Sequence, residues 1–102
     1  MTANALRGEA ALTLAGGTIA LRPSFAALVA AEAELGPLFA LVERAAAGGL
    51  TLSEMAGLFW HCLVDRPAGL TREDFAEALV TAGLASVSPA LRVLLGQVLA
   101  GR

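Results

Sequence analysis

The chain of 102 residues contains no lysine, one cysteine and one histidine, and only 16% of its residues are charged. An average soluble domain has roughly 25% charged residues. The shortage of polar surface favours a partner or a self-associating surface. The seven cations are arginines scattered from Arg7 to Arg102, and the formal net charge is −2. Because no basic stripe is present to follow a phosphate backbone, the composition argues against nucleic-acid binding.

Neither a disulfide nor a membrane span fits the sequence. The single cysteine, Cys62, has no partner within the chain and is typical of a reducing cytoplasm. The longest apolar stretches are interrupted by Glu32, His61 or Arg92, well short of the roughly 18 residues that a membrane span needs. Glu9 precedes every apolar run, unlike the start of a secretory signal. We therefore expect a cytoplasmic protein.

Residues 10–21 read AALTLAGGTIAL and predict a β-hairpin. Two short alternating runs surround Gly16-Gly17, a dipeptide that supplies the positive φ angles of a tight turn. If these glycines form the loop, Leu14 lies opposite Ile19, with apolar side chains on one face and threonines on the other. A lone hairpin is marginal in water, so its apolar face must be covered by helices or by a second copy of the protein.

Residues that begin and end helices divide the rest of the chain. Ser24 is a good N-cap and Gly36 a stop for the first helix. Pro37 can open a second helix at its first position, and Gly48-Gly49 ends it. These signals predict a helix, a sharp turn and a second helix.

Two later helix starts share one design. Thr51 with Glu54 forms a capping box, and Thr71 with Asp74 forms a weaker one. The first of these helices should end near Asp65, before a breaker run, and the second near Gly83. Finally, Ser88-Pro89 predicts a cap with proline at the first position of a closing helix.

These patterns predict a mainly α (α+β) fold, in which an N-terminal β-hairpin precedes a compact bundle of about five short helices. The length is common for one domain. We expect a single domain over residues 1–102, with an N-terminal arm at 1–8, the hairpin at 9–22 and the helical bundle at 23–102.

Residue types that carry catalysis or bind metals are scarce. His61 and Cys62 are neighbours on a predicted helix, where they point about a quarter-turn apart, and no second histidine or cysteine completes a metal site. We favour packing over catalysis for both. A calcium loop after Asp65 fails because Pro67 and Gly69 stand where ligands belong. We therefore expect no enzyme, no catalytic residue, no metal and no cofactor.

Glu32 is the most informative charge. It falls on the same helical face as Phe25 and Val29, where a lone carboxylate would be costly to bury. Arg22 and Arg7 are the candidate partners, since a guanidinium can bind a carboxylate through two hydrogen bonds. The favoured interpretation is a clamp between hairpin and helix, and a binding role is the alternative.

Several short motifs follow one another in a fixed order, mainly in the first third of the chain. They are Arg7-Gly8-Glu9, then Leu21-Arg22-Pro23-Ser24-Phe25 with Ala27-Leu28, then Glu32 and Leu35-Gly36, with weaker echoes at Leu70 to Leu79 and Ala82-Gly83-Leu84. This order resembles the small tail proteins of gene transfer agents and related tailed phages, described as tail tube-associated or tail assembly chaperone-like. Ser24 stands where threonine is more often expected, a change that preserves the cap.

The resemblance implies a non-enzymatic bacterial protein encoded among tail genes, in a gene transfer agent or a prophage. The first hypothesis is a tail assembly chaperone that shields the apolar helices of the tape measure protein until tube subunits polymerise around them. The second is a structural subunit that self-associates and is retained in the tail, with the hairpin adding an edge to a neighbour.

The expected partners are the tape measure protein or other tail proteins, and a further copy of the chain. Trp60 is either part of the core or the centre of an interaction patch. The residues expected at the partner surface are Phe39, Val42, Met55, Phe59 and Trp60.

Overall fold

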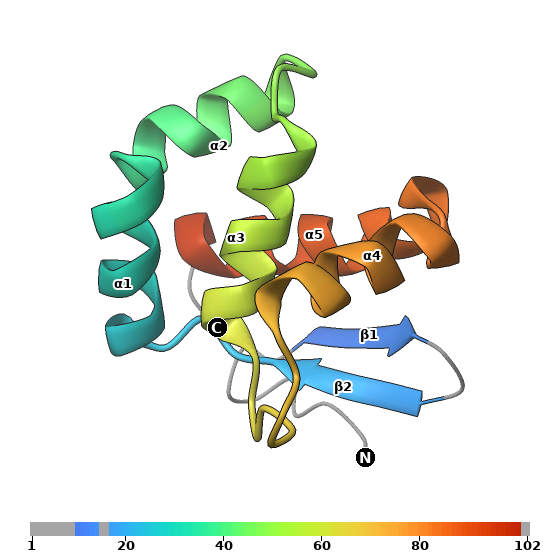
Figure 1. Cartoon of the computed structure of the whole chain (residues 1–102). Coiled ribbons are helices and arrows are strands. Elements are labelled where there is room, and N and C mark those ends of the chain that lie inside the picture. Colours follow the sequence, from blue (N-terminus) through green and yellow to red (C-terminus); the bar gives the residue numbers. More distant parts are fainter. Residues whose placement is uncertain (1–9, 15–16, 101–102) are drawn as a thin grey trace.

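The computed structural model describes residues 10–14 and 17–100, and in this part of the chain it contains two strands and five helices (Figure 1). The elements in order are β1 (Ala10–Leu14), β2 (Gly17–Leu21), α1 (Phe25–Leu35), α2 (Leu38–Ala46), α3 (Leu52–Cys62), α4 (Arg72–Ala82) and α5 (Leu84–Ala100). The predicted α+β class, a hairpin followed by helices, is confirmed. The assignment of residues 1–102 to one domain stays a prediction.

The two strands pair in an antiparallel register two residues away from the one predicted. Leu14 lies opposite Gly17 rather than Ile19, and Thr13 lies opposite Thr18. Of the predicted turn, Gly16 lies outside the described residues. Because side chains alternate with a period of two, a shift by two leaves each side chain on its predicted face. Leu14 is accordingly buried and Thr13 exposed.

Most of the predicted helix ends are confirmed. Ser24 caps α1, and Gly36 ends it with a φ of 86°. Thr51 and Glu54 form the complete capping box at the start of α3, with hydrogen bonds of 3.1 and 3.0 Å. Thr71 caps α4 through the Asp74 N–H. These ends are set by neighbouring residues, which is why the sequence predicts them.

Helix α3 ends at Cys62, before the predicted end near Asp65. The chain beyond it lies against β2, where Leu63 forms an antiparallel bridge with Leu21 and the Val64 N–H donates to the Ala20 carbonyl (3.0 Å). An extended backbone is needed for this pairing, so the helix stops early. The breaker run is thus preceded by a short extended segment that covers one end of the β2 edge.

The predicted start of the last helix at Ser88-Pro89 is wrong, because α5 begins at Leu84 and contains Pro89. The Gly83 carbonyl, at the end of α4, already accepts the N–H of Ser86 and Val87. The Ser88 hydroxyl donates to the Leu84 carbonyl (2.7 Å) instead of capping a new helix. Pro37 also differs from its prediction, since it precedes α2 as the N-cap residue.

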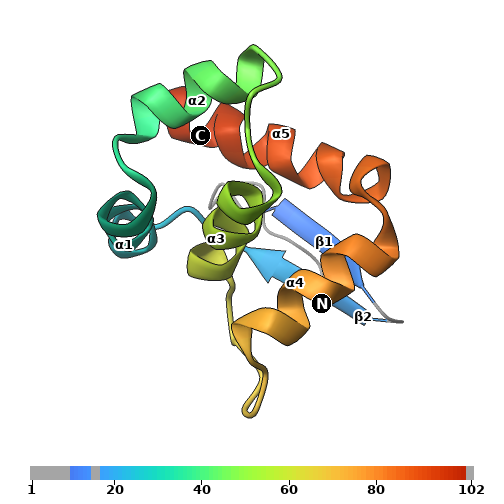
Figure 2. The ribbon, with the colours of Figure 1, turned by 45° about the horizontal axis from the view of Figure 1, so that its top comes forward.

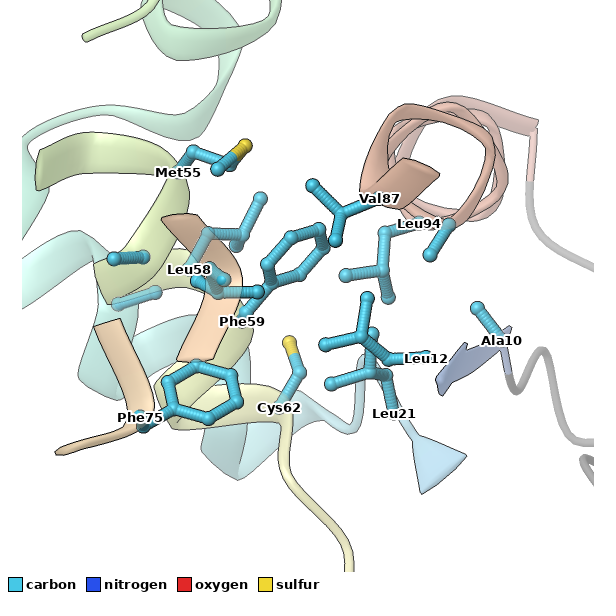
Figure 3. Packing of buried hydrophobic residues seen from close by; sticks show 14 of the residues in the cluster. Ala10, Leu12, Leu21, Met55, Leu58, Phe59, Cys62, Phe75, Val87 and Leu94 are labelled. Carbon is cyan, nitrogen blue, oxygen red and sulfur yellow. The ribbon is translucent and has the colours of Figure 1, made fainter. Parts of the chain in front are cut away.

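Helix α3 lies at the centre of the structure. It packs against α1 on one side and α4 on the other, and α5 packs against β1 and α4 (Figures 1 and 2). Phe59 on α3 is fully buried, surrounded by Val87 and Leu94 of α5 and by Leu12 and Leu21 of the hairpin (Figure 3). The apolar face of the hairpin is thus covered by helices of the same chain.

Among the described residues, no single helix is long and apolar enough to cross a membrane, although the sharply bent pairs α1 with α2 and α4 with α5 have the combined length and composition.

Candidate functional site

The segment after β2 joins the hairpin to α1. The Arg22 N–H donates to the Cys62 carbonyl (2.7 Å), and the Ser24 N–H donates to the Arg22 carbonyl (2.9 Å). The Ser24 hydroxyl accepts the Ala27 N–H (3.2 Å) as the N-cap of α1. These bonds tie β2, the end of α3 and the start of α1 together, so the segment has the geometry of a structural joint.

The other predicted signature residues lie at different places. Pro23 is half-buried within the joint, and Gly36 forms the turn between α1 and α2. Arg7, Gly8 and Glu9 lie outside the described residues.

Glu32 does not form the predicted pair with Arg22. Its carboxylate accepts the Leu38 N–H (3.0 Å), and its own carbonyl accepts the Gly36 N–H (3.0 Å). Glu32 therefore satisfies an unpaired donor at the start of α2 and fixes the turn, where the two helices meet at 77°. The face that Glu32 shares with Phe25 points outward, so Glu32 is exposed rather than buried. Its other predicted partner, Arg7, lies outside the described residues, so that pairing stays a prediction.

A cluster of hydrogen-bonded polar side chains links three helices. Glu34 on α1 accepts two hydrogen bonds from the Arg72 guanidinium of α4, one of them at 2.6 Å. The Nε2 of His61, on α3, lies 2.9 Å from Oε1 of Glu34. The bidentate hydrogen bond from Arg72, followed by that from His61, lowers the pKa of Glu34 to about 2. The same bond with Glu34 raises the pKa of Arg72.

Gly57 on α3 lies beneath this cluster. A methyl group built at its Cα would lie 2.6 Å from Nη2 of Arg72 and 3.3 Å from both Oε2 of Glu34 and Cδ2 of Leu35. Glycine therefore lets α1 and the arginine approach the α3 backbone closely. The cluster has the form of a staple that holds α1, α3 and α4 together.

Chemistry at the His61-Cys62 pair is not supported by the geometry. The histidine faces Glu34, whereas Cys62 is buried in the core, where loss of water contact raises the pKa of its thiol to about 12. The thiol is therefore protonated at neutral pH. The part of the chain that the structure describes contains no group of three or more histidine, cysteine or carboxylate residues placed to hold a metal ion.

Large apolar side chains are exposed where α1, α2 and the end of α5 meet. Phe25 is 84% exposed and Phe39 is 76% exposed, and Val29 beside them is 48% exposed. Together with Leu28, Leu38 and Val98 they line a groove in which Glu32 is the one charged residue among those that the structure describes. This Phe25–Phe39 groove, as we call it, is the kind of apolar surface that binds another protein.

The predicted partner surface divides in the structure. Phe39 is exposed and Val42 half-buried, so both remain available to a partner. Met55 and Phe59 are buried in the core, and their predicted place on the surface is wrong, because α3 is enclosed by other elements. Trp60 is half-buried, and its ring centroid lies 5.9 Å from that of Phe75. The Cζ of Arg66 lies 4.0 Å from the centroid of the Trp60 ring.

Sequence reasoning missed the Glu34 staple and the outward orientation of Phe25. Glu34 and Arg72 are 38 residues apart, and no local spacing connects them. The one available signal is Gly57, a helix-weakening residue inside a strongly predicted helix, which often marks a close approach.

An exposed apolar groove on a small helical scaffold is typical of proteins that bind other proteins. Residues 7–101 match the family model described as phage tail tube protein, GTA-gp10. The chain therefore belongs to this phage tail tube family, and its resemblance to gene transfer agent tail proteins is confirmed. A search of curated proteins and a search of solved structures each found no significant match.

Proposed function

We propose that the chain is a non-enzymatic structural subunit of a phage-like tail, that it associates with further copies of itself and with other tail proteins, and that it remains in the finished particle. Membership of the tail tube family over residues 7–101 is the observation that carries this proposal. Exposure of Phe25 and Phe39 supports it, because aromatic side chains left in water on a charge-poor surface are typical of an interface.

The proposal gives the chain two locations. It would be made in the bacterial cytoplasm and then incorporated into the particle as the tail forms. The family description as a phage tail tube protein favours the structural hypothesis over the chaperone hypothesis, since a tube component is retained in the finished tail.

A tail assembly chaperone remains the second candidate, because of the apolar lining of the Phe25–Phe39 groove. Apolar walls around a single carboxylate suit the apolar face of an amphipathic helix, as in helix-in-groove recognition. The tape measure protein, rich in such helices, would be the partner.

Quantitative mass spectrometry of purified particles tests the proposal. A structural subunit will be present in a fixed ratio to the other tail proteins in every preparation. If the chain is abundant in producing cells but absent from particles, the structural role is wrong. A soluble complex with the co-expressed tape measure protein would then establish the chaperone role.

A further inference from the structure

A second groove runs between α2 and α5. Its lining is apolar or small, with one charged residue among those that the structure describes. The main contributors are Val42, Ala46, Leu95, Gly96, Leu99 and the charged residue, Arg92. Leu99 is 59% exposed, and Arg92 forms no ion pair with any described residue. The groove is thus an open apolar surface with one positive charge.

No contact with another described residue explains Gly96. It lies in α5, where glycine weakens a helix relative to alanine, and an added methyl group would meet nothing within 4 Å. Gly57, by contrast, is needed beneath the Glu34 staple. A glycine at an open groove is what the close approach of a second backbone requires.

A different surface, on α4, has the opposite charge. Glu73, Ala76, Glu77 and Val80 recur at the spacing of one helical face, and with Leu52 of α3 they line a hollow. Val80 is 54% exposed and Leu52 is 45% exposed. Neither glutamate forms an ion pair with another described residue. This α4 face therefore combines exposed apolar side chains with two negative charges.

The two surfaces lie on different sides of the molecule. In both views α2 lies on one side of α3 and α4 on the other (Figures 1 and 2). One chain therefore cannot bring its own α4 face into its own α2–α5 groove. Two complementary surfaces on different sides are the requirement for a heterologous contact, which joins identical subunits into rings or filaments.

We propose that the α4 face of one copy binds the α2–α5 groove of a second copy, so that the chains associate head to tail. Glu77 then lies close to Arg92 of the neighbour, and Val80 packs against the apolar lining near Gly96. This contact rests on the proposed structural role, because it is the means by which copies of the chain would associate in the tail.

Charge selects this arrangement over symmetric ones. If two grooves met, the interface would hold Arg92 of both copies, and if two α4 faces met, it would hold the glutamates of both copies, so each would carry charge of one sign only. Like charges brought together at an interface are strongly unfavourable. Among pairings of these two surfaces, only the groove against the α4 face places an arginine beside glutamates.

Charge reversal in the full-length chain tests the proposal, with association measured by sedimentation velocity over a wide range of concentrations. Arg92→Glu and Glu77→Arg should each raise the dissociation constant at least about tenfold. The double variant Arg92→Glu/Glu77→Arg should recover association, and so should an equimolar mixture of the two single variants, because opposite charges meet again in both.

Two further variants make the test specific. Glu43→Arg makes the same charge change at an exposed residue that lines neither surface, and it should associate like the wild type. Gly96→Leu should block the groove and abolish association while its helix content and melting temperature are kept or raised.

The proposal is overturned if the wild type is monomeric at all concentrations, if the two reversals have no effect, or if they fail to compensate each other. Binding of a tape measure fragment in the groove in place of a second copy would also overturn it. Presence in particles is measured separately, so a subunit found there whose association ignores these substitutions refutes the surfaces alone. Absence from particles refutes the structural role alone.

Discussion

The thiol of Cys62 lies in the core at the end of α3, 1% exposed. With its pKa raised to about 12, almost none of it is thiolate at pH 8, and reagents cannot reach it in the folded chain. We expect Ellman's reagent to react with it orders of magnitude more slowly in the native protein than in guanidinium chloride. Rapid native reaction would show that α3 opens readily or that the thiol is accessible.

Glu34 gives the stability of the chain an acid-sensitive component. Its pKa falls from 4.5 to about 2 in the folded state, so the unfolded state binds more protons between these values. The stabilisation is therefore complete above pH 4.5 and is lost as the pH falls toward 2. The Glu34 side chain is 37% exposed, and solvent screening limits the contribution to about 1 kcal/mol or less.

Replacing Glu34 by Gln should lower the free energy of unfolding at pH 7 by that amount. It should also flatten the acid limb of the stability curve, which is the fall in this free energy as the pH drops from 4.5 toward 2. Urea unfolding at a series of pH values measures both effects. Glu43→Gln, at an exposed residue without an ion pair among the described ones, is the control and should leave the curve unchanged. An unaltered acid limb in Glu34→Gln would contradict the staple.

Two glycines within helices make a matched pair at the scale of the element. Gly57→Ala gains about 0.5–1 kcal/mol of helix propensity. The new methyl group, however, crowds Leu35 and displaces Arg72 from Glu34, and overpacking of this kind costs about 1–3 kcal/mol. We therefore expect net destabilisation of about 1 kcal/mol.

Gly96→Ala should have the opposite effect, because the space around it is open and only the propensity gain remains. Its melting temperature should rise by a few degrees when measured at a concentration low enough to keep the chain monomeric. If both substitutions stabilise the chain equally, α1 and α3 do not pack as closely as the structure shows.

At the scale of the whole molecule, substitutions in the Phe25–Phe39 groove should impair assembly and leave the stability of the chain nearly unchanged. Replacing both phenylalanines by serine removes apolar surface that is already largely in water. The free energy of unfolding should therefore change by no more than about 0.5 kcal/mol. We expect the variant to fold and to be lost from purified particles, or to be strongly reduced there. Phe75→Ala, at a buried position, should instead cost about 3–5 kcal/mol.

Wild-type levels of the serine variant in particles would show that this groove contacts no tail protein. Circular dichroism of the purified variant excludes misfolding as the cause of a loss.

The sequence by itself determined most of the element ends, because these depend on nearest neighbours, whereas the end of α3 depends on its pairing with β2 and the start of α5 was predicted wrongly. Ser24, Thr51 and Gly83 each satisfy or terminate the backbone a few residues away, and the alternation around the glycine pair selects the faces of the hairpin. The short motifs near the joint also sufficed to identify the family.

Only the tertiary structure decided which side of each helix is covered. Helix α1 carries apolar residues on several sides, so its sequence does not say that Ala31 is buried and Phe25 is exposed. For the same reason Glu32 was expected to be buried, while Glu34, the α1 carboxylate that pairs with Arg72, was missed. Packing joins residues far apart in the chain, and a contact over 38 residues has no local spacing from which it could be predicted.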